Sequence, residues 1–344
     1  MPVRVYDYQN SKTPLMLGLA ENVLEKEVPG NYFLDTDWLK GPSILITLRE
    51  KESEERLADQ VKQYVEHYKN ENSVDPVVIE TIKRKYEKEQ KRLIDLELRT
   101  AENIEMKDDG VVEIGEGKSG VYNSEYHRQL FHRFRFLSQP VNNKLLKEIS
   151  DMNEKERTKL FTEMFLYIAT LFNGNITQGY ISYLSHVMGF FSRLKLEGHD
   201  ENVKERFDDL YNKLFKEEVI NYTQETKSAL SEWKEVWKTI SDDMRADFKK
   251  EKFIDDKNLD LNIQYQMFKK HISKMDNPFH NLLLEKGDLE ALMMSDEMII
   301  YRNIINLFYI TLPFFEQGML KKHFYGYCAI KHVEENYSNL LMKI

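Results

Sequence analysis

The chain has 344 residues, of which 41% are apolar and 31% charged, so it can bury a sizeable core and is not disordered. Its 49 basic and 58 acidic residues give a net charge of −9, which argues against general nucleic-acid binding. The single cysteine, Cys328, excludes an intrachain disulfide and a cysteine-based metal cluster within one chain. The first residues lack the apolar segment of a secretory signal, so we expect a soluble cytoplasmic protein.

The first 140 residues mix strand-like and helical patterns. Alternating apolar residues and their flanking turns predict strands at 3–8, 32–38, 43–48 and 111–114. A Lys40-Gly41-Pro42 turn joins the second strand to the third, which predicts a hairpin. Helical periodicity predicts helices at 14–27, 53–69 and 75–99.

From Asn142 onward, apolar residues recur with the helical period almost throughout. Helices are predicted at 143–172, 177–196, 201–219, 223–250, 258–275, 280–292, 295–312 and 317–342. No internal repeat or low-complexity linker interrupts the chain. We therefore expect an α+β fold, in which a small antiparallel sheet with helices (residues 1–140) packs on a mostly helical part (residues 141–344) and shares its core.

The most apolar run of the sequence is 295–315. Ser295, followed by two acidic residues, is typical of a helix N-cap, and Pro313 is expected near the end of the helix. At 100° per residue, Ser295, Met298 and Tyr301 fall within an arc of about 120°. One side of the helix thus presents a hydroxyl, a thioether and a phenol.

Two interpretations of this run remain open. Arg302, Asn303 and Asn306 interrupt it, which disfavours a membrane span. It is then a core helix that lines a polar pocket, or a core helix whose few polar groups are simply satisfied. Arg302 itself could contact a substrate or form an internal ion pair.

Other motifs carry weaker signals. The glycines of 115–120 fit G-x-G-x-x-G but belong to no βαβ unit, so a flexible turn is favoured over nucleotide binding. The segment 126–136 interleaves His and Arg with aromatic residues, as a half-buried structural element or an anion or peptide contact would. Among His323, Cys328 and His332 no zinc-site spacing occurs, so no metal site is expected.

Two further residues are candidates for proton transfer. Glu105, in an acidic cluster with Glu102, could act as a general base if it is buried, although a solvated loop is the simpler interpretation. His186 lies on an apolar helix, where a single histidine is more often a satisfied core residue than a catalytic one.

Three segments resemble the lantibiotic dehydratase C-terminal, thiopeptide-type bacteriocin biosynthesis family. The segment 32–48, with Trp38 before Gly41-Pro42, resembles that family's aromatic-W-x-x-G-P-H strand pair. Tyr183-Leu-Ser185-His186 is similar to its central Ser-His helix, and the helix from Ser295 with the aromatic final helix is similar to its C-terminal region. The resemblance covers nearly the whole chain.

Departures from the family pattern separate its branches. Glutamate-eliminating members follow Gly-Pro with a His and two alternating Arg, where this chain has Ser43, Leu45 and Thr47. A glutamyl carboxylate needs cationic partners, so that activity is disfavoured. Ser295 and Tyr301 instead match the Ser and Tyr two turns apart in thiopeptide (thiocillin- or micrococcin-like) pyridine synthases, although Met298 replaces a polar residue between them.

The resemblance implies a cofactor-free formal aza-[4+2] cycloaddition of two dehydroalanines in a leader-bearing thiazolyl peptide, with loss of water and of the leader amide. The implied catalytic residues are Tyr301, Ser295, His186 and Glu105, and the implied substrate contacts are Trp38, Met298, Arg302 and Asn306. The expected partners are the ribosomally made precursor peptide and other maturation enzymes, with no nucleic acid and no membrane. The alternatives are the glutamate-eliminating half of a split dehydratase and a non-catalytic leader-binding protein.

Overall fold

The computed structural model describes residues 2–50, 54–96, 104–115, 117, 125–196, 198, 202–215, 228–251, 266, 269–270 and 295–337. The chain divides into two compact units. The first comprises Met1–Ser150 with Thr311–Glu316, and the second comprises Asp151–Ile310 with Gln317–Ile344. The predicted helix at 280–292, nearly all of that at 258–275, and Glu102 lie outside the described residues. The predicted boundary near residue 140 and the shared core stay predictions.

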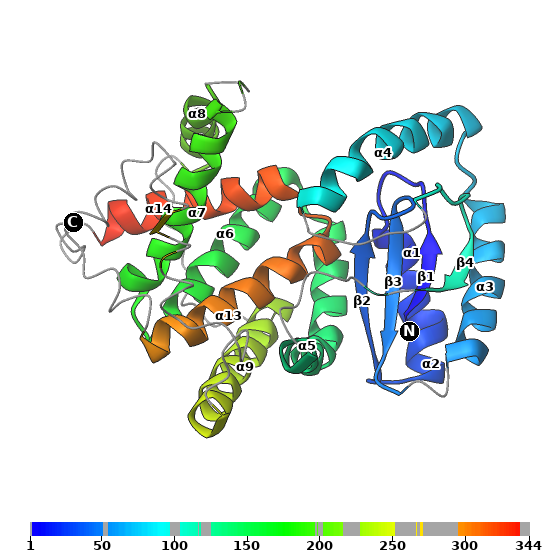
Figure 1. Ribbon diagram of the computed structural model, residues 1–344, viewed down its shortest axis with the longest axis horizontal. Helices are drawn as coiled ribbons and strands as arrows, with labels where there is room; N and C mark the ends of the chain where they lie inside the picture. Colours follow the sequence, from blue (N-terminus) through cyan, green and yellow to red (C-terminus); the bar gives the residue numbers. More distant parts are fainter. Residues whose placement is uncertain are drawn as a thin grey trace. The chain divides into compact units, whose positions relative to one another are not determined.

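The first unit contains a four-stranded antiparallel sheet in the order β2-β3-β1-β4 (Figure 1). Its strands are β1 Val3–Tyr6, β2 Tyr32–Asp37, β3 Ser43–Leu48 and β4 Val112–Ile114. In the register, Val3 lies opposite Ile46 of β3 and Ile114 of β4. The predicted hairpin is confirmed, and so is the α+β class with a small antiparallel sheet and a helix-rich C-terminal part.

A glycine fixes the turn of this hairpin. Gly41 has φ +123, a backbone conformation that residues other than glycine rarely adopt. A Cβ at this position would also lie 2.6 Å from the Tyr8 hydroxyl oxygen. The turn predicted from Lys40-Gly41-Pro42 therefore needs glycine both for its conformation and for its close approach to Tyr8.

The first unit also contains helices, some of which contact the sheet through their apolar residues. They are α1 Thr13–Leu19, the π-helical η1 Ala20–Leu24, α2 Glu25–Glu27, α3 Glu54–Glu71, α4 Pro76–Leu96 and α5 Glu125–Ser150. On α3, Leu57, Val61 and Val65 repeat every four residues and are buried, and this helix contacts β1 and β4. Helix α5 contacts β2.

Two details of the helical prediction are wrong. The segment 126–136 belongs to α5, which begins at Glu125 and contains Pro140 in its interior. The single helix predicted at 143–172 is two helices, because Asn153 and Glu156 form a capping box that starts a new helix at Glu154. The polar residues Asp151 and Asn153 were the sequence signal for this break.

The second unit is helical in its described residues. It contains α6 Glu154–Thr170, α7 Ile176–Leu196, α8 Val203–Phe215, α9 Ala229–Glu251 and α14 Met319–Asn336, together with α13 Asp296–Thr311 as far as Ile310. Helices α6, α7 and α14 contact one another pairwise (Figure 1). At Gly179 of α7 a Cβ would lie 2.0 Å from the Ala169 carbonyl oxygen of α6, so only glycine allows this approach.

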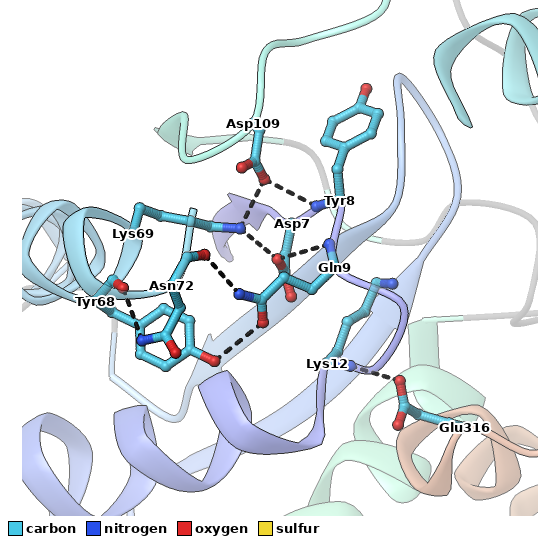
Figure 2. A network of polar contacts seen from close by, with 9 residues as sticks. All are labelled: Asp7, Tyr8, Gln9, Lys12, Tyr68, Lys69, Asn72, Asp109 and Glu316. Carbon is cyan, nitrogen blue, oxygen red and sulfur yellow. Dashed lines mark hydrogen bonds and ion pairs between the residues drawn. The ribbon is translucent and has the colours of Figure 1, made fainter. Parts of the chain in front are cut away.

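A network of polar contacts fastens the segment after β1 to its surroundings in the first unit (Figure 2). The Lys69 ammonium lies 2.5 Å from Asp7 Oδ1 and 2.7 Å from Asp109 Oδ1. Asp7 is fully buried, and Lys69 and Asp109 are each only 13% exposed at their side chains. We call Asp7, Lys69 and Asp109 the Lys69 network; it joins the segment after β1, helix α3 and the segment before β4.

The apolar run 295–315 behaves as a core element. Among the described residues, Asp296–Phe315 is long and apolar enough to cross a membrane, but 72% of its apolar window is buried inside the protein. Burial to this extent agrees with the interpretation of the run as a core helix.

Candidate functional site

The predicted start of α13 at Ser295 is confirmed. The Ser295 Oγ accepts a hydrogen bond from the Met298 backbone N–H at 3.2 Å, and two acidic residues occupy the first turn. Pro313 lies in the 3₁₀ turn Leu312–Phe315 that follows the helix, as expected. The Ser295 hydroxyl thus caps α13, and its catalytic role stays a prediction.

The Tyr301 phenol lies in the core of the second unit. Its side chain is fully buried, and its hydroxyl donates to the Gly179 carbonyl oxygen at 3.0 Å. Burial raises the pKa of Tyr301 well above its ordinary value, so the phenol stays protonated and acts as a hydrogen-bond donor. The structure therefore gives this hydroxyl a partner on α7, at the glycine that lies against the Ala169 carbonyl of α6.

Tyr309 contacts His186. The Tyr309 hydroxyl lies 3.1 Å from His186 Nδ1, and the two rings are 5.3 Å apart. The Tyr309 phenol also acts electrostatically on Tyr301 and on Tyr183, whose own hydroxyl donates to the Phe165 carbonyl. We call Tyr183, Tyr301, Tyr309 and His186 the tyrosine–histidine cluster; it brings together two of the predicted catalytic residues.

The cluster is polarised from core to surface. His186 is exposed, so the interpretation as a core histidine is wrong, whereas its catalytic role stays a prediction. Burial raises the pKa of Tyr309 far above its ordinary value, so this phenol remains protonated beside the imidazole. The arrangement can deliver or accept a proton at an exposed imidazole while the half-buried Tyr309 phenol fixes the orientation of its ring.

The other predicted site residues are distributed over both units. In the second unit, Met298 is buried, Arg302 is half-buried and Asn306 is exposed. In the first unit, Trp38 directly follows β2 and is half-buried. Glu105 was expected to act as a base only if buried, and its side chain is exposed.

Two cations that no sequence motif pointed to lie beside the tyrosine–histidine cluster. The Lys322 ammonium of α14 lies 4.7 Å from the centroid of the Tyr309 ring. Burial, with the Arg193 guanidinium of α7 nearby, lowers the pKa of Lys322 to about 8. We call Arg193 and Lys322 the cation pair. The only sequence signal was a basic residue at the end of one helix and one near the start of another.

His323 follows Lys322 and belongs to the same surroundings. Its ring stacks on Phe190 of α7 with centroids 4.1 Å apart, and its Nδ1 lies 2.7 Å from the Met319 carbonyl oxygen. Burial and the positive charge of Lys322 lower the pKa of His323 to about 3, so its imidazole is neutral near pH 7. This histidine packs α14 on α7 and adds no charge to the cation pair.

A pocket of about 170 Å³ opens between α7, α8 and α14 of the second unit. Its lining combines apolar side chains with charged ones: Leu184, Val187, Met188, Lys204, Asp208, Tyr327, Ile330, Lys331 and Glu334. Tyr327 donates to Asp208, and Lys331 lies 3.3 Å from the same carboxylate. None of the predicted catalytic residues lines this pocket.

The weaker motifs find structural explanations. Within 126–136, Arg128 pairs with Glu125, and the buried Arg135 lies 3.2 Å from Asp35, which favours the structural interpretation of this segment. The strand before Gly115 pairs antiparallel with β1, so it does not open a βαβ unit. Over the described residues, no group of three or more His, Cys, Asp or Glu side chains is placed to hold a metal ion.

Comparison with known proteins identifies the fold. No family model and no curated protein matches this sequence. Among solved structures, the chain is similar to the pyridine synthase TbtD from thiomuracin biosynthesis, with a TM-score of 0.62, 16% sequence identity and 98% of both chains covered. It is also similar to TsrL, with a TM-score of 0.62 and 12% identity, over 98% of this chain and 95% of TsrL. The chain therefore has the fold of the pyridine synthase TbtD and of TsrL along nearly its whole length.

Proposed function

We propose that this protein is a thiopeptide pyridine synthase. One observation carries the proposal: the chain shares its fold with a pyridine synthase over 98% of both chains. The spacing of Ser295 and Tyr301 on the late helix, which resembles that of such enzymes, supports it independently of the fold. The substrate would be a linear, leader-bearing peptide with thiazoles and two dehydroalanines.

The reaction would be a formal aza-[4+2] cycloaddition. One dehydroalanine and the iminol tautomer of its preceding amide form the four-atom component, and the second dehydroalanine supplies the alkene. Two carbon–carbon bonds form and close the macrocycle. Loss of water and then of the leader peptide as its amide leaves a pyridine, so no oxidant or reductant is needed.

The principal catalytic requirement is to bring two alkenes of a flexible peptide together. Oriented binding can supply roughly 7–11 kcal/mol toward such a barrier, because it removes the entropy cost of the encounter. The pocket between α7, α8 and α14 has apolar walls at Val187 and Ile330, and its volume of about 170 Å³ suits one ring-sized group. We infer that a thiazole or an apolar side chain of the peptide occupies it.

The second requirement is controlled proton transfer, because the amide must be held as its iminol and two eliminations must follow. The His186–Tyr309 pair, with 3.1 Å between Nδ1 and the hydroxyl, is the exposed part of the tyrosine–histidine cluster and can exchange protons with a bound peptide. Tyr301 and Ser295 stay the predicted catalytic hydroxyls. For Tyr301 to reach a substrate, its phenol must leave the Gly179 carbonyl that it contacts here.

The direct test is to incubate the purified protein with a synthetic linear peptide that carries a leader, thiazoles and two dehydroalanines. Mass spectrometry should detect the released leader amide and a pyridine-containing macrocycle. The matched control peptide has alanine in place of one dehydroalanine and should remain linear. An unchanged test peptide would contradict the proposal.

A second candidate function, leader binding without catalysis, is favoured by a specific observation. Both predicted catalytic hydroxyls contact the backbone: Ser295 caps α13 and Tyr301 donates to Gly179. Tight binding of the leader peptide by a protein that leaves the test peptide linear would support this second candidate. Glutamate elimination remains disfavoured, because Arg4, which donates to Ser43, already lies 2.9 Å from the Asp37 carboxylate.

A further inference from the structure

The cation pair consists of a half-buried lysine, Lys322, and an exposed arginine, Arg193, and it differs from two other pairs of charges in the second unit. Lys234 lies 2.6 Å from Glu163, and Arg245 lies 2.6 Å from Glu297. Among the described residues, neither Arg193 nor Lys322 forms an ion pair with a carboxylate. A half-buried ammonium near a second positive charge is unfavourable, and an anion placed beside Lys322 offsets this penalty.

The groups around Lys322 come from three helices, and none of them supplies a negative charge. Helix α13 presents the face of the Tyr309 ring, and α7 presents Arg193 and the exposed His186. The neighbouring His323 of α14 packs on α7 through its neutral ring. The environment is therefore positive or neutral on every described side.

An exposed apolar side chain lies next to this charge. Met319 precedes Lys322 by three residues on the same face of α14, and its side chain is 63% exposed. The preceding residue, Gly318, provides no side-chain cap for the helix, and the first turn carries no acidic residue. A ligand at this place would meet one apolar surface and two positive charges.

We propose that Arg193 and Lys322, with Met319 beside them, form a docking site for a carboxylate of an acidic peptide segment. The site lies next to the His186–Tyr309 pair, so a peptide held there would present neighbouring residues to the tyrosine–histidine cluster. The proposal rests on the proposed function only in taking the ligand to be a peptide. It assigns the cation pair to substrate binding and not to the bond-forming steps.

Binding can be measured by fluorescence anisotropy with a labelled peptide of glutamate and leucine residues. The comparison peptide has glutamine in place of every glutamate and should bind weakly. Lys322→Met, which keeps the length of the apolar stem, should weaken binding of the acidic peptide about tenfold, as expected for losing one charge-assisted contact. The matched control is Lys321→Met, because Lys321 lies 3.3 Å from Glu154, and its affinity should stay near that of the wild type.

The pH dependence and a charge-restoring variant make the test independent of folding defects. Because the site needs the protonated amine, and the pKa of Lys322 is near 8, wild-type affinity should fall as the pH rises through that value. Lys322→Arg should bind at pH 7 and keep its affinity above pH 8, since a guanidinium stays protonated. Equal weakening in Lys321→Met and Lys322→Met, or no weakening in either, would overturn the proposal.

Two further arms separate this inference from its alternatives. If inorganic phosphate binds as tightly as the acidic peptide, the site is a general anion site and the peptide assignment is wrong. If the acidic peptide binds through Lys322 but no macrocycle forms from the dehydroalanine substrate, the docking site stands and the pyridine synthase proposal fails. If the macrocycle forms while Lys322→Met leaves peptide affinity unchanged, the pyridine synthase proposal stands and the docking-site proposal fails.

Discussion

The Lys69 network of the first unit and the cation pair of the second differ in whether their positive charges have carboxylate partners. In the first, one ammonium lies between two carboxylates, at 2.5 and 2.7 Å, and Asp7 is fully buried. In the second, two cations lie near one another and no described carboxylate pairs with either. The Lys69 ammonium thus has two carboxylate partners within the chain, although Asp7 Oδ2 has no hydrogen-bond partner. Among the described residues, Lys322 instead meets the face of the Tyr309 ring and no carboxylate.

The presence or absence of a carboxylate partner, and not burial, is what separates the two groups of charges. Buried ion pairs elsewhere in the first unit follow the pattern of the Lys69 network: Arg4 lies 2.9 Å from Asp37, and Arg135 lies 3.2 Å from Asp35. Each costs desolvation energy that its partner offsets, and each becomes strongly destabilising if one partner is removed. Perturbed groups without such a partner are where binding sites are expected.

The largest expected effect is on the stability of the protein when the Lys69 network is broken. Lys69→Met removes the ammonium and leaves two low-exposure carboxylates near one another, which should cost about 3–5 kcal/mol of unfolding free energy. Lys62→Met, at an exposed position of the same helix, is the matched control and should change stability little. Denaturant unfolding measures both, and equal stability of the two variants would show that the Lys69 network does not hold the first unit together.

A smaller effect is expected from the tyrosine–histidine cluster. Tyr301→Phe removes the hydrogen bond to the Gly179 carbonyl, which should cost about 1 kcal/mol, the usual net value of such a bond. If Tyr301 is also catalytic, macrocycle formation should fall far more than stability does. The control is Tyr180→Phe, another buried tyrosine of the second unit. A loss of rate no larger in Tyr301→Phe than in this control would make Tyr301 a structural residue only.

The smallest effect, and one of opposite sign, is expected from the cation pair. Lys322→Met should leave the free protein as stable as the wild type or slightly more stable, because it removes a desolvated positive charge next to Arg193. The pKa of Lys322 is lowered from 10.5 to about 8 in the folded protein, so the unfolded chain binds more protons between these values. Wild-type stability relative to the variant should therefore rise with pH over this window.

The measurement is thermal or denaturant unfolding at a series of pH values from 7 to above 10, for the wild type and Lys322→Met. The stability difference should be greatest below pH 8 and shrink as the pH approaches 10.5. A variant that is clearly less stable at pH 7 would indicate that Lys322 has an internal partner. The contrast between the two regions would then disappear.

By itself, the sequence determined the local elements and the fold class, because these follow from short-range patterns. The alternation in 32–48 and its Gly41 turn predict the hairpin, and Ser295 with its acidic neighbours predicts the start of α13. Periodicity did not predict the break between α5 and α6. The apolar pattern continues through it, and the capping box of Asn153 and Glu156 starts the new helix.

Only the tertiary structure decided what the polar residues contact. Ser295, Met298 and Tyr301 were correctly placed on one helix, but their surroundings depend on which helix packs against them, and Gly179 of α7 receives the Tyr301 hydroxyl. Tyr309, Arg193 and Lys322 become neighbours only through the packing of α7, α13 and α14. The physical reason is that helical periodicity specifies which face of a helix is apolar, whereas desolvation, pairing and repulsion of charges depend on residues distant in sequence.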